Sequence, residues 1–479
     1  MAGRVSSPRL VGRAEELARL AAALDRAAAS DPAAVLVAGE AGVGKTRLVA
    51  EFTSRAIDGG VSVLTGSCVA LIEGELAYAP LVEALRGLLQ RLDPTAVTGL
   101  LEGGRSDLAR LLPELGEADR LPPAPDPPGG AGQARLFAAL VGLLRRLSQS
   151  VPVVVVVEDL HWVDRSTLAF LSYLLGSLRD ERLLLVVTYR SDELPAVHRV
   201  RRWLAEQHRS GRVEHLELQR FTRAELAEQL SGIVGAPAPE WVEEIFARSE
   251  GNPFFAEELV AFSAGGVAGA LPTRLREVLL VRVADCSPTA QAVLRVAAVA
   301  GRRVDERLLV AVAPLGEAEL LAGLREAVDR QLLIVQPGQD TYAFRHALLQ
   351  EAVYGELLPG ERARLHGVLA DSIADGLGSG EMDWSGSAAE VAVHWHRARD
   401  LPKALEWSIG AAVEAEAMHA HAEAARHYQR ALEVWDRVSV AEARAGVARG
   451  GIRSGRWLGG GVGWWAAGRR WLADRDGGG

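Results

Sequence analysis

Residues 35–46 have the sequence VLVAGEAGVGKT, and this stretch decides the fold. Its apolar start leads into the pattern G-x-x-x-x-G-K-T, whose fixed members are Gly39, Gly44, Lys45 and Thr46. The apolar run before the pattern predicts a strand, and the amphipathic residues after it predict a helix. Strand, glycine-rich loop and helix in this order are the context that the pattern requires. We therefore predict a loop that binds phosphate groups.

The residue types of this P-loop suit a nucleotide. Gly39, Gly42 and Gly44 let the backbone N–H groups turn toward one point, where the helix N-terminus adds partial positive charge. Lys45 would reach the β- and γ-phosphates of a nucleoside triphosphate, and the Thr46 hydroxyl would be a ligand of Mg²⁺. Lys45 is one of only two lysines among 53 basic residues, so the pattern is hard to reach by chance.

A second acidic element follows the apolar run of residues 153–157, which are all valine. Such a β-branched run is typical of a strand that is buried on both faces of a parallel sheet. Glu158 and Asp159 come directly after it, at the edge where they would lie beside the P-loop, hold Mg²⁺ and orient a water molecule. Glu158 occupies the usual place of a metal-facing acid and Asp159 that of a water-activating one, but their roles stay open at this point.

A third apolar run, residues 183–187, ends near Arg190, and an arginine at this strand edge can sense the terminal phosphate. Residues 61–64 and 213–218 supply two further strands between helical patterns. Strands that alternate with helices predict a parallel α/β sheet. The expected fold class is an α/β P-loop NTPase with a five-stranded parallel sheet of the ASCE type, followed by a helical lid, a winged helix and α-helical repeats similar to tetratricopeptide (TPR) repeats.

The pattern along the chain predicts five regions. We expect residues 1–219 to form the P-loop ATPase domain, with an exposed Pro- and Gly-rich loop at 121–132, because five prolines and three glycines fall in that short stretch. The following regions are listed in order: a helical lid at 220–271, a winged-helix-like domain at 272–370, TPR-like helices at 371–438, and an atypical Gly/Trp/Arg tail at 439–479. The tail does not continue the helical pattern, and we interpret it as disordered or as the product of a frame shift.

Composition excludes several classes of protein. The chain has 479 residues, of which 49% are apolar, and a net charge of −9, so its main activity is not the neutralisation of nucleic-acid phosphates. Its two cysteines, Cys68 and Cys286, are far apart, which excludes a disulfide framework and a cysteine metal site. We find no membrane-length apolar run and no signal-peptide pattern, and we expect a cytoplasmic protein with no membrane partner.

The expected winged helix has no excess of positive charge. Residues 272–370 contain 12 arginines and 12 acidic residues, which gives a net charge of zero. A winged helix that reads DNA should carry a basic face. We therefore interpret this region as a structural module or a switch, and we do not expect this chain alone to bind DNA.

Several motifs in this order resemble one family, the STAND-type regulatory ATPases of bacteria, and in particular the large ATP-binding regulators of the LuxR family related to MalT. The likeness covers roughly residues 8–438. The motifs are Val11-Gly12-Arg13, the P-loop, EDLHW at 158–162, TYR at 188–190, GNP at 251–253 and FRH at 344–346. Members of this family end in further repeats and a helix-turn-helix, and this chain has neither.

The resemblance implies roles that spacing alone does not give. Val11, Gly12 and Arg13 would lie near the adenine, and Pro253 would pack on the base from the helical lid. Arg190 would be the sensor arginine.

His346 would contact the β-phosphate in the ADP-bound state; a core or capping histidine is an equally good interpretation of its sequence. Glu158 stands where the family often has Asp, which leaves the hydrolysis rate open.

From these features we expect an ATP- and Mg²⁺-dependent switch in transcriptional regulation. ADP would keep the lid and winged helix closed, and ATP, together with an unknown inducer or protein partner on the helical repeats, would open the chain for self-association. Slow ATP hydrolysis would reset the state. The alternatives are a mechanochemical AAA+ ATPase of the origin-recognition type, which predicts a basic winged helix, and the ATPase module of a nucleotide cyclase.

Overall fold

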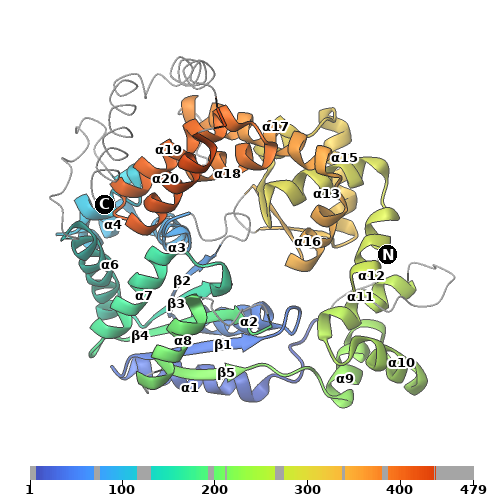
Figure 1. The fold of residues 1–479 in the computed structure, drawn as a ribbon. Coiled ribbons are helices and arrows are strands. Elements are labelled where there is room, and N and C mark those ends of the chain that lie inside the picture. Colours follow the sequence, from blue (N-terminus) through green and yellow to red (C-terminus); the bar gives the residue numbers. More distant parts are fainter. Residues whose placement is uncertain are drawn as a thin grey trace.

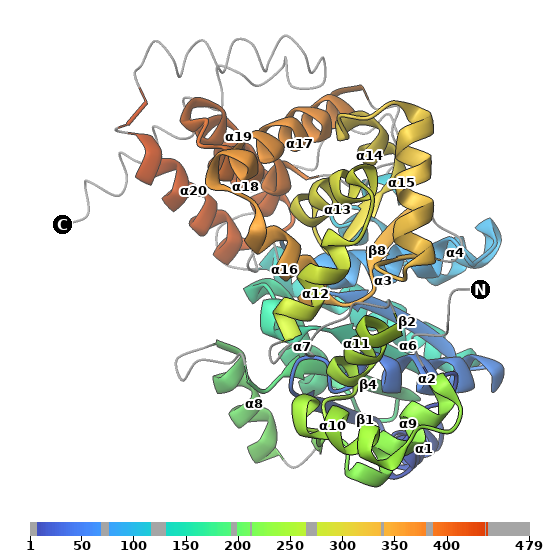
Figure 2. The ribbon, with the colours of Figure 1, turned by 90° about the vertical axis from the view of Figure 1, so that its right-hand side faces the viewer.

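The computed structural model describes residues 7–68, 76–115, 131–192, 199–210, 213–264, 275–336, 340–379, 387–435 and 437–438. Figure 1 shows a parallel sheet with its covering helices, a group of lid helices beside it, and a helical layer formed by the later part of the chain. The second view, in Figure 2, places the last helices on the opposite side of the sheet from α1. The expected tail at 439–479 lies outside the described residues.

Five strands form a parallel sheet in the order β2-β3-β4-β1-β5. They are β1 (Ala33–Gly39), β2 (Ser62–Ser67), β3 (Val153–Glu158), β4 (Leu183–Arg190) and β5 (Val213–Glu217). Strands β1, β3 and β4 are buried along their whole length, as near-continuous Val and Leu runs require when helices cover both faces of a sheet. The predicted P-loop NTPase fold with a five-stranded parallel sheet is confirmed, and β4 is the strand inserted between β1 and β3.

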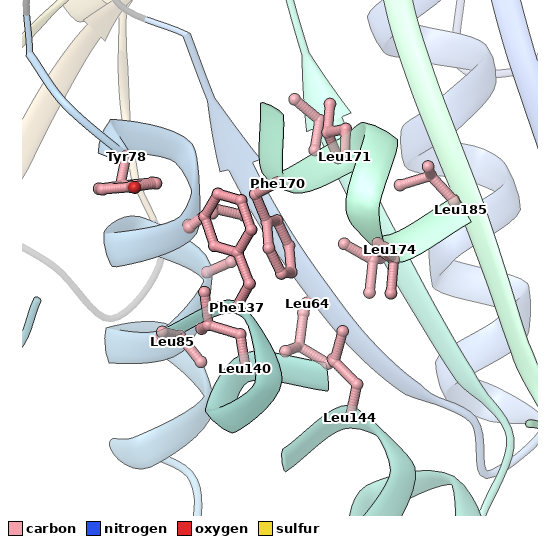
Figure 3. Close-up of a cluster of buried hydrophobic side chains, with 14 of the residues drawn as sticks. Leu64, Tyr78, Leu85, Phe137, Leu140, Leu144, Phe170, Leu171, Leu174 and Leu185 are labelled. Atoms are coloured by element: carbon pink, nitrogen blue, oxygen red, sulfur yellow. The ribbon is translucent and has the colours of Figure 1, made fainter. Parts of the chain in front are cut away.

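Alternate residues of each strand face different helical layers. On one face, α1 (Ala14–Ala28) and α2 (Lys45–Asp58) pack on side chains such as Val154 and Val156. On the other face, Val155 and its neighbours pack against α3 (Ala79–Leu89), α6 (Ala131–Ser150) and α7 (Arg165–Ser177). Figure 3 shows this second core, in which the rings of Phe137 and Phe170 lie 5.5 Å apart between centroids. The remaining elements of this part are α4 (Pro94–Leu100), α5 (Arg105–Leu108), the turn η2 (Pro113–Leu115), the turn η3 (Leu160–Trp162) and α8 (Arg199–Ser210).

The expected loop at 121–132 needs one correction. Residues 121–130 lie outside the described residues, but Ala131 and Gly132 already belong to α6. The helix α6 is held in place by Leu136, Phe137 and Leu140, which recur at helical spacing and are buried in the core. This helix begins before Gly132, which the count of prolines and glycines places in the loop.

The region predicted as a lid, for which we keep that name, contains α9 (Arg223–Val234), α10 (Pro239–Ser249) and α11 (Pro253–Ala264), and α12 (Leu275–Ala284) follows it. The Thr222 hydroxyl caps α9 by accepting from the Glu225 backbone, while the Glu225 carboxylate accepts from the Thr222 backbone. This reciprocal pair fixes the start of the helical region at the position that the sequence predicts.

A compact unit follows, with three helices, a small sheet and a closing helix. The helices are α13 (Pro288–Ala300), α14 (Glu306–Val312) and α15 (Glu317–Asp329), and α16 (Ala347–Glu356) closes the unit. Its sheet contains β6 (Arg303–Asp305), β7 (Leu333–Val335) and β8 (Thr341–Phe344) in the antiparallel order β6-β8-β7. Strand β6 has only three residues, too few to give an alternating pattern in the sequence.

Four helices complete the described chain: α17 (Pro359–Ser379), α18 (Ala388–Ala398), α19 (Leu401–Ala417) and α20 (His421–Trp435). The expected boundary between the winged-helix-like domain and the TPR-like helices, at residues 370/371, falls inside α17. Leu369 and Ala370 on one side of this boundary and Ile373 on the other are buried in the same core, to which α13 also contributes, so the helix is not divided there. Ala415, Ala420 and Ala424 are buried in the core of the P-loop domain, so the last helices pack directly on it. No helix among the described residues has the length and apolar character needed to cross a bilayer.

Candidate nucleotide-binding site

A cavity of about 290 Å³ lies where five parts of the chain meet. The P-loop with the start of α2 forms one wall, and the segment before α1 forms another. The carboxyl edge of the sheet contributes Asp159 and Arg190, the lid contributes Gln229 and Pro253, and the last wall includes His346. All the predicted site residues line this cavity except Gly12, Gly39 and Glu158.

The P-loop wraps around the Lys45 side chain. Gly42 and Gly44 have φ angles of 80° and 105°, in the left-handed region that favours glycine, and α2 begins directly after Gly44. The Lys45 Nζ atom donates to the carbonyl oxygens of Gly39 at 2.7 Å and Glu40 at 2.8 Å. The ammonium group is thereby held inside the loop beside the first N–H groups of α2, where positive charge and backbone donors coincide.

The lid is fastened to the P-loop by Asn252, the only asparagine in the chain. Its Nδ2 donates to the Ala41 carbonyl at 2.9 Å, and its Oδ1 accepts from the backbone N–H groups of Phe254 and Phe255 at the start of α11. A Cβ atom on Gly42 would lie 3.0 Å from Asn252 Oδ1, so the loop and lid are in direct contact. The sequence places Asn252 in a turn but gives no indication of this second role.

The segment before α1 is positioned by Arg13. Its guanidinium donates to the carbonyls of Val43 at 3.2 Å and Gln219 at 2.6 Å and lies 4.9 Å from the centroid of the Phe221 ring. Arg13 therefore joins this segment to both the P-loop and the lid, which keeps Val11 on the cavity wall. Gly12 lies against α9 instead of the cavity.

The two acids at the end of β3, Glu158 within the strand and Asp159 directly after it, have different environments. Asp159 lines the cavity, and its carboxylate forms an ion pair with Arg302, at the turn between α13 and β6. The Asp159 backbone has φ 56° and donates to the Thr188 hydroxyl at 3.0 Å. The Glu158 side chain is buried behind the cavity wall, and its burial, followed by the charge of Asp159, raises its pKa to about 7.

Arg190 ends β4 in register with Gly39, the first P-loop glycine. Its side chain is buried and reaches Glu351 of α16, with 3.4 Å between Nη1 and Oε1. Asp159 and Arg190 are therefore both paired with groups from the α13–α16 unit. Arg302 and Glu351 carry no motif in the sequence, because each is 143 or more positions from its partner.

His346 stands at the start of α16 and stacks on Phe254 of the lid, with 3.6 Å between ring centroids. Its Nε2 atom is buried and has no hydrogen-bond partner among the residues that the structure describes. Burial, followed by the charge of Arg345, lowers the pKa of His346 well below its usual range. The ring is thus neutral, and one polar nitrogen remains available at the cavity wall.

A buried carboxylate links the lid to both neighbours. Glu257 of α11 accepts from Arg47 of α2 at 3.4 Å, from Arg345 at 3.0 Å and from Gln229 of α9 at 3.0 Å. All four side chains line the cavity. Sequence analysis missed this network, since its members come from separate elements.

The donor set fits a nucleotide bound with Mg²⁺. Thr46 is exposed at the start of α2 and lines the cavity together with Asp159. Hydroxyl and carboxylate oxygens are ligands that Mg²⁺ prefers. Glu158, also predicted as a metal ligand, has its side chain buried and does not line the cavity.

Residues 9–187 match the family model described as the AAA ATPase domain. The chain is also 27% identical over 468 residues to an uncharacterized protein of Rhizobium meliloti (strain 1021). This match covers 91% of the chain but 44% of that relative, so the chain spans less than half of the relative's length.

The chain is similar in fold to the crystal structure of a Signal Transduction ATPase with Numerous Domains (STAND) protein with a tetratricopeptide repeat sensor from Pyrococcus horikoshii. The TM-score is 0.53 at 14% identity, over 97% of this chain and 59% of that one. At this identity the likeness concerns the fold alone. A match to Thermotoga maritima RuvB, with a TM-score of 0.30 at 17% identity over 70% of this chain and 92% of that one, carries no argument here.

The chain therefore contains a P-loop NTPase fold, and the part of it at residues 9–187 is similar to the AAA ATPase domain. Around that domain, the chain shares the overall fold of a STAND ATPase that carries a repeat sensor.

Proposed function

We propose that this chain is a STAND-type switch in which bound ATP or ADP decides whether the α13–α16 unit stays docked on the P-loop domain. One observation carries the proposal. Asp159 and Arg190, which line the cavity together with the P-loop, form ion pairs with Arg302 and Glu351 of the docked unit. A ligand that draws on these two residues would therefore also act on the docking contacts.

In the docked state, Lys45 and the N–H groups of the P-loop would hold the phosphates of ADP. The neutral His346 ring would donate its Nε2–H to a phosphate oxygen, which would satisfy an atom that has no partner among the described residues. Since His346 belongs to α16, that hydrogen bond would favour the docked arrangement.

Release of Asp159 from Arg302 would free its carboxylate to orient a water molecule for slow hydrolysis, with Glu158 behind it and Arg190 beside the terminal phosphate. The same release would weaken the hold on the α13–α16 unit. Mg²⁺, held by Thr46 and Asp159, would neutralise charge on the phosphates.

The output that fits this arrangement is transcriptional regulation of the LuxR-family type. An inducer or protein partner would bind the TPR-like helices α17–α20, the α13–α16 unit would act as a winged helix without DNA-reading charge, and ATP would promote self-association. The similarity in fold to a STAND ATPase with a tetratricopeptide repeat sensor supports the sensor role proposed for α17–α20.

The test measures ADP and ATP affinity of the wild type and of Lys45→Ala by calorimetry with Mg²⁺ present, and molecular size in each state by light scattering. We expect the substitution to lower the affinity for both nucleotides by at least roughly a hundredfold, because it removes a buried ammonium group from the phosphate site. Lys403→Ala, which removes the other lysine far from the cavity, is the matched control and should bind like the wild type.

Two results would overturn the proposal. One is a wild-type protein that takes up neither nucleotide at millimolar concentration. The other is nucleotide binding that Lys45→Ala leaves unchanged.

A further inference from the structure

A buried amide on the lid faces the cavity with one polar atom unused. Gln229 of α9 is only 2% exposed and lines the cavity together with Val11 and Pro253. Its Oε1 atom is buried and accepts no hydrogen bond from any residue that the structure describes. A buried amide oxygen without a partner is costly, and it indicates a group that a ligand satisfies.

The orientation of this amide is fixed by its neighbours. The Gln229 Nε2 atom donates to the Pro253 carbonyl at 3.2 Å and to Glu257 Oε1 at 3.0 Å. Both partners are acceptors, so the NH₂ group must face them and the oxygen must face away. Glu257 is itself held by Arg47 and Arg345, which leaves the amide little freedom to turn over.

We propose that Gln229 is the residue that selects the base, with its Oε1 accepting a hydrogen bond from the exocyclic amino group of adenine. The inference rests on the proposed function and deepens it. The P-loop fixes the phosphate end of the cavity, and Gln229 lines the same cavity from the lid, in contact with Pro253. An adenine there supplies the N–H donor that Oε1 lacks, while its flat faces meet apolar side chains.

The same geometry rejects a base with a carbonyl at that position. Inosine differs from adenosine by carrying an oxygen in place of the amino group and a proton on the adjacent ring nitrogen. That oxygen would face the buried Gln229 Oε1, so two acceptors would meet and neither would gain a donor. Sites built to hydrogen-bond one such group discriminate strongly against its replacement, since a buried polar atom is then left unpaired.

The experiment compares ADP with inosine diphosphate by calorimetry on the full chain, because neither ligand can lose a γ-phosphate during titration. Wild type should prefer ADP by roughly tenfold to a hundredfold. In Gln229→Leu and in Gln229→Met, which keeps the length of the side chain, the preference should fall below about threefold. General damage to the lid would weaken the binding of both ligands by the same factor, and this factor cancels in the ratio of the two affinities.

Two controls separate this inference from the proposed function. Gln149→Leu, an exposed glutamine at the end of α6, should keep the wild-type preference. Lys45→Ala should lower the affinities for ADP and inosine diphosphate by the same factor, so the ratio of the two affinities should stay at the wild-type value.

The role of Gln229 would be overturned if the wild type bound ADP and inosine diphosphate equally well, or if the Gln229 variants kept the preference for ADP. The proposed function would survive either result, because the chain would still bind a nucleotide. A wild type that binds neither diphosphate would remove the proposed function and this inference together.

Discussion

Asn252 uses both ends of one amide, which no other residue type can do at this position. Its oxygen caps α11 by accepting from two backbone N–H groups, and its NH₂ group donates to the Ala41 carbonyl of the P-loop. An aspartate keeps the acceptor but has no donor, and an alanine has neither. The two substitutions therefore separate the helix cap from the contact with the P-loop.

We expect Asn252→Asp to keep the α11 cap but to weaken ADP binding roughly fivefold, because the lid loses one hydrogen bond to the loop. Asn252→Ala should also lower the free energy of unfolding by about 1–2 kcal/mol. Calorimetry and urea titration measure the two effects. Wild-type ADP affinity in both variants would contradict the role of the amide.

A second residue-scale feature is a buried histidine pair. His366 and His394 lie 2.8 Å apart between Nδ1 atoms, and His366 Nε2 is 3.0 Å from the Tyr354 hydroxyl. Arg397 and Arg362 are the charged groups nearby. Burial lowers the pKa of His394 from 6.5 to about 4, and burial, followed by the neighbouring ring, lowers the pKa of His366 as well.

From this histidine pair we predict that the free energy of unfolding decreases in acid. The unfolded chain takes up protons as the pH falls below 6.5, whereas the folded pair stays neutral until about pH 4 for His394. The free energy of unfolding should therefore decrease across that window, by at most roughly 1.4 kcal/mol per ring and pH unit. Urea titrations of wild type and a His366→Leu, His394→Leu double variant measure it; equal slopes against pH would refute the prediction.

At the scale of elements, the turn between α13 and β6 holds the α13–α16 unit against the edge of the sheet. Arg302 pairs with Asp159, and its neighbour Arg303 pairs with Glu83 of α3. Arg190 and Glu351 form a further contact with the charges reversed. The first pair joins this turn to Asp159 on the cavity wall. Because Arg302 is not part of the P-loop, a substitution of Arg302 perturbs the turn and leaves the P-loop residues unchanged.

We expect Arg302→Ala to accelerate ADP release roughly tenfold, since it removes a contact that exists only in the docked arrangement. Stopped-flow displacement of a fluorescent ADP measures the rate. Arg307→Ala, an exposed arginine on the adjoining α14, should leave that rate unchanged. An Arg302→Ala rate equal to the wild type would show that the pair does not control release.

At the scale of the whole molecule, the last described helix returns to the P-loop domain. Glu423 of α20 is 1% exposed and accepts from the Arg165 N–H at 2.8 Å and the Ser166 hydroxyl at 2.5 Å, both in the first turn of α7. Gln133 of α6 adds a bond to the His419 carbonyl at 3.1 Å. These contacts therefore join α20 directly to α7, the first α-helix after Asp159.

Glu423→Ala should lower the free energy of unfolding by about 1–3 kcal/mol, because it leaves buried donors at the start of α7 without a partner. Amide hydrogen exchange should show faster exchange in the first turn of α7. Glu433→Ala, an exposed carboxylate on the same helix, is the control. Unchanged exchange in α7 would mean that α20 does not restrain it.

The local features of the site were predictable from sequence, and its closure was not. The P-loop, the two acids at the end of β3 and Arg190 at the end of β4 all follow contiguous apolar runs, so their positions on the sheet could be inferred. Gln229 and Arg302 stand in ordinary amphipathic or turn sequence. Nothing in their neighbourhoods distinguishes them from surface residues.

The sequence by itself determined a phosphate-binding loop on a buried parallel sheet, because glycine conformation, β-branched runs and helix caps act between residues close along the chain. Only the tertiary structure decided which side chains close the cavity and which way the Gln229 amide points. Those choices depend on contacts such as Arg302 with Asp159, 143 positions apart, and a contact at that range leaves no periodic trace in the chain.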